Sequence, residues 1–151
     1  MRRAVLWQYC VLSMLAFLVP ITNAADAPNL AKPKIIVPEN IAGVETLSAA
    51  DVVNKAQKVS NLLVIDSRIE NDRLNGYIDS SISLPDTKTN CHTLAEIAGD
   101  KDRPLLFYCN GVKCGRSVVA IKIAKACGYT NISWFRGGFE EWLQSGYPYL
   151  K

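Results

Sequence analysis

Short apolar runs that lack polar alternation recur along the chain, with segments of helical character between them. Two of the runs are typical of strands buried on both faces of a parallel sheet: residues 62–65 and 104–108. A further strand is predicted at residues 131–135. A weaker candidate strand spans residues 81–84. Helices are predicted at residues 49–59, 93–98, 116–127 and 139–144. This alternation predicts an α/β domain whose mainly parallel central sheet is flanked by helices.

The N-terminus has the layout of an export signal. Arg2 and Arg3 precede an uncharged apolar run of 16 residues, 4–19, and small side chains follow. We expect a signal peptide over residues 1–24, cleaved between Ala24 and Ala25, and hence an exported, periplasmic protein. An uncleaved membrane anchor is the alternative, but the run falls short of the roughly 20 residues that a membrane helix needs. No stable membrane anchor is expected after cleavage.

The remaining chain divides into an arm and a domain. Residues 25–42 contain Pro28, Pro33 and Pro38. Because proline fixes φ and lacks a backbone donor, this segment is predicted to be an extended arm. The folded domain is expected over residues 43–151.

The charge pattern argues against a nucleic-acid partner. The chain has 17 Lys and Arg against 14 Asp and Glu, a net charge of +3, and these residues are interspersed. A nucleic-acid partner would require a basic stripe or patch. Four cysteines follow the predicted signal peptide: Cys91, Cys109, Cys114 and Cys127. In an oxidising compartment they allow three complete pairings, among which the sequence does not choose.

Cys109 stands where ligands bind in open α/β sheets, just beyond the carboxyl end of a buried strand. A loop of residues 110–115 with two glycines follows it, and Arg116 opens a helix. Backbone amides and the positive end of a helix dipole stabilise a thiolate and lower a cysteine pKa. Lys113 and Arg116 would add positive charge. A reactive thiolate is therefore the favoured interpretation of Cys109, and a buried, inert thiol is the alternative.

Several stretches together resemble a rhodanese-like domain over residues 46–147. They are Asp66-Ser67-Arg68 after a strand, Gly76-Tyr77-Ile78 through Ser83-Leu84-Pro85, Tyr108-Cys109 with Arg116-Ser117, Gly128-Tyr129 to Trp134, and Arg136-Gly137-Gly138-Phe139 with Trp142. Each motif alone is weak, but their order and spacing together are specific to this family.

The resemblance implies a sulfurtransferase in which Cys109 takes a sulfane sulfur from a donor such as thiosulfate and passes it, as a persulfide, to a thiol or cyanide. Arg116 would be the anion contact. The substrate cradle would consist of Asn110, Gly111, Val112, Lys113, Cys114 and Gly115. Asp66 and Arg68 would be supporting positions, with a structural ion pair as an equally good interpretation. The expected partners are a small sulfur-containing anion or a thiol, including a protein thiol, and no metal or cofactor is expected.

The loop departs from the family's commonest pattern, in which the arginine follows the cysteine more closely. Here the interval is 116 − 109 = 7 residues. Longer loops also occur in rhodanese-like phosphatases and arsenate reductases, so oxyanion chemistry is an alternative to sulfur transfer. Cys114 adds a further alternative, a thiol redox or sulfur-relay protein that uses Cys109 and Cys114. Cys114 could resolve the persulfide, form a disulfide with Cys109 or fill space.

The other two cysteines are expected to be structural. Cys127 falls late in a predicted helix beside alanines, so we expect it to be buried. Cys91 adjoins His92, but adjacent residues rarely bind the same ion, and a structural zinc needs four donors. We therefore expect Cys91 to be a loop thiol and His92 to begin a helix.

Overall fold

The computed structural model describes residues 36–151 and contains one five-stranded sheet in the order β1-β5-β4-β2-β3, with every neighbouring pair parallel. The strands are β1 (Glu45–Leu47), β2 (Leu63–Asp66), β3 (Ile82–Ser83), β4 (Leu105–Tyr108) and β5 (Ile132–Phe135). The helices are α1 (Ala49–Lys58), α2 (Glu70–Arg73), α3 (Cys91–Ala98), α4 (Arg116–Ala126) and α5 (Gly138–Gln144), with a 3₁₀ turn, η1, at Asp86–Lys88. The predicted α/β class with a parallel sheet is confirmed.

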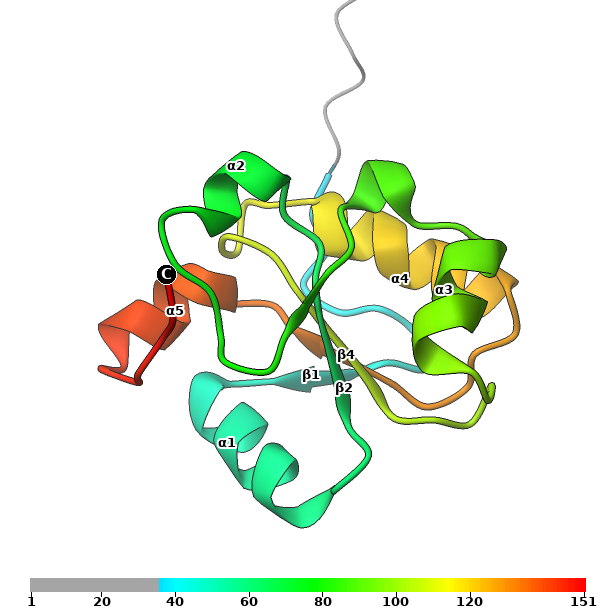
Figure 1. Cartoon of the computed structure of the whole chain (residues 1–151), viewed down its shortest axis with the longest axis horizontal. Helices are drawn as coiled ribbons and strands as arrows, with labels where there is room; N and C mark the ends of the chain where they lie inside the picture. The colour runs from blue at the N-terminus through cyan, green and yellow to red at the C-terminus, as the bar shows by residue number, and fades with distance from the viewer. Residues whose placement is uncertain (1–35) are drawn as a thin grey trace, which may run out of the picture. The chain divides into compact units, whose positions relative to one another are not determined.

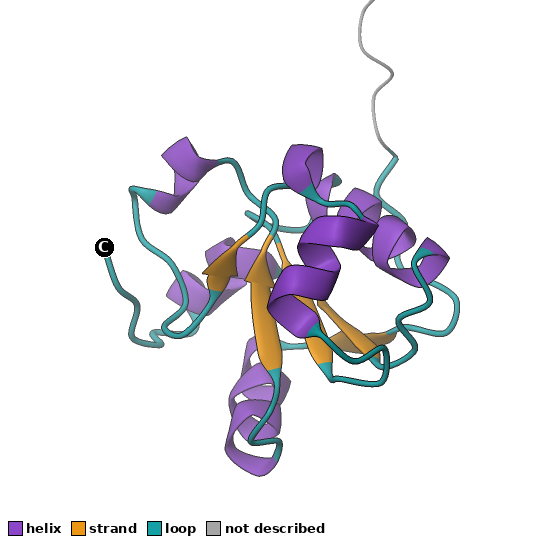
Figure 2. Cartoon of the chain, turned by 45° about the vertical axis from the view of Figure 1, so that its right-hand side comes forward, coloured by secondary structure: helices purple, strands orange, loops and turns teal. Residues whose placement is uncertain are grey.

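Helices cover both faces of the sheet (Figures 1 and 2). On one face, α3 and α4 pack on alternate strand residues such as Ile65 and Phe107. On the other, α1 and α5 pack on Val64 and Leu106. The three central strands are therefore buried along their whole length, which explains why apolar residues dominate them. The polar exceptions are Asp66 at the end of β2 and Ser133 in β5.

Three short elements are absent from the sequence prediction. β1 has only three residues, two of them exposed, so no apolar run marks it. Neither α2 nor η1 contains a fully buried residue, and four and three residues are too few to show a helical period. α3 begins two residues earlier than expected because the Asn90 side chain caps it by accepting from the amides of His92 and Thr93.

The predicted arm is described only from residue 36 onward, and the predicted signal peptide lies outside the described residues. Residues 36–42 form no helix or strand. They are nevertheless fixed to the domain: Val37 and Ile41 pack on the core, and Arg136 donates from Nε to the carbonyl of Pro38 at 3.0 Å. Among the helices formed by residues 36–151, none is long and apolar enough to cross a membrane.

Cys91 and Cys127 form a disulfide, with their Cα atoms 5.4 Å apart. This corrects two expectations. Cys91 is not a loop thiol but the exposed first residue of α3, and Cys127 is not a buried free thiol but a half-buried residue at the end of α4. Both positions lie at helix termini, where side chains reach the surface, so the pair joins α3 to α4.

Candidate active site

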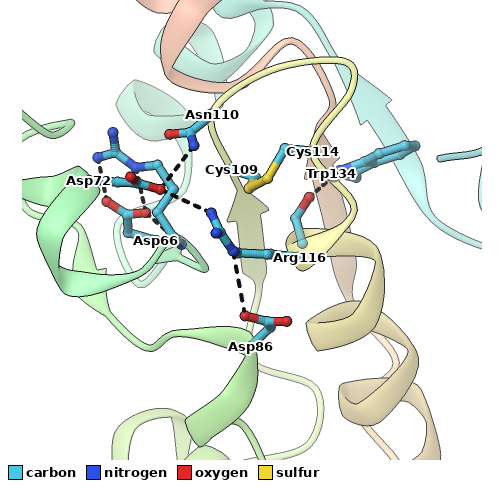
Figure 3. The surroundings of a disulfide bond; sticks show 10 residues. Asp66, Asp72, Asp86, Cys109, Asn110, Cys114, Arg116 and Trp134 are labelled. Atoms are coloured by element: carbon cyan, nitrogen blue, oxygen red, sulfur yellow. Dashed lines mark hydrogen bonds and ion pairs between the residues drawn. A yellow bond between two sulfur atoms is a disulfide. The ribbon is translucent and has the colours of Figure 1, made fainter. Parts of the chain in front are cut away.

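Cys109 follows the last residue of β4 at the carboxyl edge of the sheet, where it is only 2% exposed. Figure 3 shows it bonded to Cys114 on the same loop, and the Cα atoms of the two cysteines are 6.0 Å apart. Cys114 is half-buried. The loop thus brings a second sulfur within bonding distance of the candidate nucleophile, and this disulfide must open before Cys109 can react.

The first residues of α5 form backbone hydrogen bonds to the start of the loop. The amide of Phe139 donates to the carbonyl of Cys109 at 2.9 Å, and the amide of Glu140 donates to the carbonyl of Asn110 at 2.7 Å. Gly138 has φ +59°, and a Cβ there would lie 2.3 Å from the Cys109 carbonyl oxygen. The Gly-Gly-aromatic motif is therefore required by a close backbone approach to the cysteine.

The loop itself forms a tight turn between β4 and α4. The amide of Cys114 donates to the carbonyl of Gly111 at 2.9 Å, Gly111 is buried, and Val112 and Lys113 are exposed. Gly115 caps α4, and within the described part of the chain no side chain caps the first amides of this 11-residue helix. Such amides and the helix dipole favour an anion at this end of the helix.

Arg116, the predicted anion contact, is held by carboxylates that the sequence analysis missed. Its Nη1 lies 2.9 Å from Oδ2 of Asp72, and its Nε lies 4.0 Å from Oδ1 of Asp86. The same Oδ2 of Asp72 accepts from Nδ2 of Asn110 at 3.0 Å. Asp72 lies in α2 and Asp86 in η1, elements without a sequence signature, and no motif pointed to either residue.

Asp66 and Arg68 form a buried bidentate ion pair beneath the loop. Arg68 Nε and Nη2 lie 2.9 Å and 2.7 Å from the two Asp66 oxygens, and the Tyr108 hydroxyl donates to Asp66 at 2.7 Å. The Arg68 guanidinium lies 4.4 Å from the ring centre of Phe139, at the start of α5. These contacts support the structural ion-pair interpretation of the two residues.

Burial and pairing act in opposite directions on the pKa values of this network. Burial favours the neutral form of Asp66, but hydrogen bonds from Arg68 and Tyr108 outweigh it and lower the carboxyl pKa below its ordinary value. Burial likewise opposes the charge on Arg68, but the Asp66 carboxylate raises the Arg68 pKa. Burial, and after it the Asp66 charge, raises the pKa of Tyr108. The Tyr108 hydroxyl therefore stays protonated and donates a hydrogen bond to Asp66.

Ser67, the middle residue of the Asp66-Ser67-Arg68 motif, is a further candidate site residue. It is fully buried, and its amide donates to the carbonyl of Tyr108 at 3.0 Å. Its Oγ has no hydrogen-bond partner among residues 36–151. Successive strand residues alternate between faces, so Ser67 and Cys109 share the sheet face opposite to Asp66 and Tyr108. An unpaired hydroxyl beside a thiolate can donate a hydrogen bond to it.

The assembled site is suited to nucleophilic sulfur chemistry. It combines a buried cysteine, loop amides, an open helix N-terminus and a second cysteine within bonding distance. Within residues 36–151, no group of three or more His, Cys, Asp or Glu side chains is placed to hold a metal ion. His92, the one histidine, lies exposed on α3 with its Nε2 3.3 Å from Glu96.

A family model for the rhodanese-like domain matches residues 48–145. The solution structure of a polysulfide-sulfur transferase homodimer from Wolinella succinogenes superposes with a TM-score of 0.57, at 25% identity over 72% of this chain and 80% of that one. A protein from Rhodopseudomonas palustris described as a possible tyrosine phosphatase gives a TM-score of 0.56, at 26% identity over 71% of this chain and 85% of that one.

One curated relative is named as a transcriptional regulator. An HTH-type transcriptional regulator of Mycobacterium tuberculosis is 25% identical over an alignment of 127 residues that covers 76% of this chain and 54% of the regulator. The chain thus spans about half the length of this relative. The shared part is a domain that also occurs within larger proteins.

Proposed function

The chain belongs to the rhodanese-like family, and on this premise we propose that it is a sulfurtransferase that moves a sulfane sulfur through a persulfide on Cys109. The observation that carries the proposal is the position of Cys109. It lies buried directly after β4, at the start of the loop that leads into the N-terminus of α4. A donor such as thiosulfate supplies the sulfur, and a thiol, including a protein thiol, or cyanide accepts it.

The proposed reaction has two balanced steps. The Cys109 thiolate attacks the outer sulfur of thiosulfate, the S–S bond of the donor breaks, and sulfite leaves with the bonding electron pair: Cys-S⁻ + S-SO₃²⁻ → Cys-S-S⁻ + SO₃²⁻. An acceptor thiolate then takes the outer sulfur and restores the enzyme: Cys-S-S⁻ + RS⁻ → Cys-S⁻ + RSS⁻. The loop amides and the α4 dipole stabilise the negative charge on sulfur before and after the first step.

The disulfide between Cys109 and Cys114 supports a second candidate, a thiol redox or sulfur-relay protein. In that role the two cysteines cycle between dithiol and disulfide, and an external thiol pair supplies or removes the two electrons and two protons. In the sulfurtransferase role the same disulfide is an inactive form that an external reductant opens. The alternative of phosphatase or arsenate reductase chemistry has less support, because the loop arginine is already paired with Asp72.

We also propose that the protein is exported and works in an oxidising compartment. The predicted signal peptide motivates this proposal, and the Cys91–Cys127 disulfide is consistent with it because such bonds persist outside the reducing cytoplasm. N-terminal sequencing of protein recovered from its native compartment is expected to begin at Ala25. A chain that still begins at Met1 would contradict the proposal.

The function is tested by sulfur transfer from thiosulfate to cyanide with fully reduced protein. Cys109→Ser is expected to abolish transfer, and Cys114→Ser is expected to retain it, because Cys114 takes no part in either step. Loss of transfer in both variants would favour the dithiol role. Transfer that persists in Cys109→Ser would refute the assignment of the nucleophile.

A further inference from the structure

We propose that Asp72 selects sulfur donors by their charge. The site then disfavours dianions such as thiosulfate and favours donors with at most one negative charge, such as thiosulfonates. This inference rests on the proposed sulfurtransferase function. It names a specificity-determining residue that acts through Arg116.

Asp72 and Arg116 form a partly shielded pair. Their side chains are 27% and 32% exposed, and Nη1 to Oδ2 is 2.9 Å. Because Asn110 donates to the same oxygen, Asp72 binds both ends of the loop, next to Cys109 and at the start of α4. Partial burial strengthens such a pair relative to one in open water. An incoming anion must therefore compete with Asp72 for the guanidinium.

A second carboxylate faces Arg116 from the other side (Figure 3). Oδ1 of Asp86 is buried, lies 4.0 Å from Nε of Arg116, and has no hydrogen-bond partner in residues 36–151. The three groups carry one positive and two negative charges, so the sum is 1 − 2 = −1. Arg116 thus lies in a cluster of net negative charge.

The rest of the loop does not reverse this sign. A Cβ at Gly111 would lie 2.2 Å from Oε2 of Glu140, so this carboxylate covers the loop. Lys113 is the other cation of the loop. Counting Arg116 and Lys113 against Asp72, Asp86 and Glu140 gives 2 − 3 = −1. Since Coulomb energy scales with the product of the charges, this field opposes a dianion twice as strongly as a monoanion.

The reaction with a thiosulfonate is balanced in the same way as that with thiosulfate. The Cys109 thiolate attacks the outer sulfur and a sulfinate leaves: Cys-S⁻ + RSO₂S⁻ → Cys-S-S⁻ + RSO₂⁻. The transferred sulfur is the same in both donors, and the donors differ by one unit of charge. Comparing them isolates the contribution of charge to specificity.

The test compares kcat/KM for thiosulfate and for methanethiosulfonate in reduced wild type and Asp72→Asn. The amide retains an oxygen that can accept from Asn110. If removal of the charge raises kcat/KM about 5-fold for the monoanion, it raises it about 25-fold for the dianion, because the Coulomb energy doubles. Asp102→Asn, which removes the same charge at the exposed turn before β4, is the matched control and is expected to change neither value.

The outcomes separate this inference from the function on which it rests. Equal changes for the two donors, or a lower kcat/KM for thiosulfate, would show that Asp72 only positions Arg116, and would overturn the inference. If neither donor forms a persulfide on Cys109 in the wild type, the proposed function itself fails.

Wild-type protein provides a second test that needs no substitution. Salt screens charges over about 10 Å at 0.1 M. Because the cluster repels a dianion, kcat/KM for thiosulfate is expected to rise as ionic strength increases, with a smaller rise for methanethiosulfonate. A fall with ionic strength would mean that the site attracts dianions, which is contrary to the inference.

Discussion

Asp66 is buried with Arg68, and each side chain makes the burial of the other tolerable. Replacing Asp66 by Asn leaves the Arg68 charge without its partner in the interior, which typically costs about 3–5 kcal/mol. We therefore expect Asp66→Asn to lower the free energy of unfolding at pH 7 by this amount in denaturant titrations. A loss below about 1 kcal/mol, the usual value of an exposed pair, would contradict the buried ion pair.

The same pair gives a pH dependence of stability. The pKa of Asp66 is lower in the folded protein than in the unfolded chain. Its stabilising contribution is therefore complete above the unfolded pKa of about 3.9, and is lost as the pH falls from there through the folded pKa. Unfolding free energies at pH 7 and pH 3 are expected to differ less in Asp66→Asn than in wild type. An equal difference would remove Asp66 as a source of acid sensitivity.

Substitutions at two glycines with positive φ distinguish the effect of backbone strain from the effect of a clash with the site. Gly146 has φ +73° and open space around its Cα, whereas a Cβ at Gly138 would meet the Cys109 carbonyl. Gly146→Ala is expected to cost about 1–2 kcal/mol and to leave sulfur transfer unchanged. Gly138→Ala is expected to cost more and to lower transfer per folded molecule, because it displaces the loop. Similar transfer rates in the two variants would contradict this role of Gly138.

At the residue scale, the sequence located the thiol but not its charged neighbours. Cys109, the loop glycines and Arg116 are contiguous, so one strand-loop-helix pattern indicated them all. Asp72 and Asp86 reach Arg116 from 44 and 30 residues away in sequence (116 − 72 and 116 − 86). Only the fold brings them together, and neither belongs to a motif with a known role.

At the scale of elements, helices and strands could be predicted where their burial produces a recognisable apolar pattern in the sequence. The strands β2 and β4 are buried on both faces and are predicted from their apolar runs, whereas β1 exposes two of its three residues and α2 has no buried residue. The helix α4 was predicted to within one residue of its end because Arg116 and Gly128 bound it. The Cys91–Cys127 pairing could not be predicted, because it depends on how α3 and α4 pack.

The Cys91–Cys127 disulfide closes a loop with a sequence separation of 36 residues between α3 and α4. Chain-entropy arguments give about 3–4 kcal/mol for a loop of this length. The double variant Cys91→Ser, Cys127→Ser is expected to unfold with a free energy lower by that amount, while sulfur transfer per folded molecule stays at the wild-type rate. Unchanged stability would show that the bond does not constrain the chain, and lost transfer would link it to the site.

At the scale of the molecule, the parallel sheet assembles the site. Because all five strands run in the same direction, the carboxyl ends of β2 and β4 place Ser67 and Cys109 side by side, and α2 and η1 meet the loop at that edge. Cys109 therefore lies where the carboxyl edge of the sheet meets α2, η1 and the start of α4. The proposed function requires that the Cys109 thiol carry sulfur.

Intact mass spectrometry of the fully reduced protein, before and after an excess of thiosulfate or methanethiosulfonate, tests this most directly. Wild type and Cys114→Ser are expected to gain the mass of one sulfur atom, removable by a thiol, and Cys109→Ser is expected to gain none. A wild-type protein that gains no sulfur from either donor, or that instead loses two hydrogens as Cys109 and Cys114 join, would contradict the persulfide account.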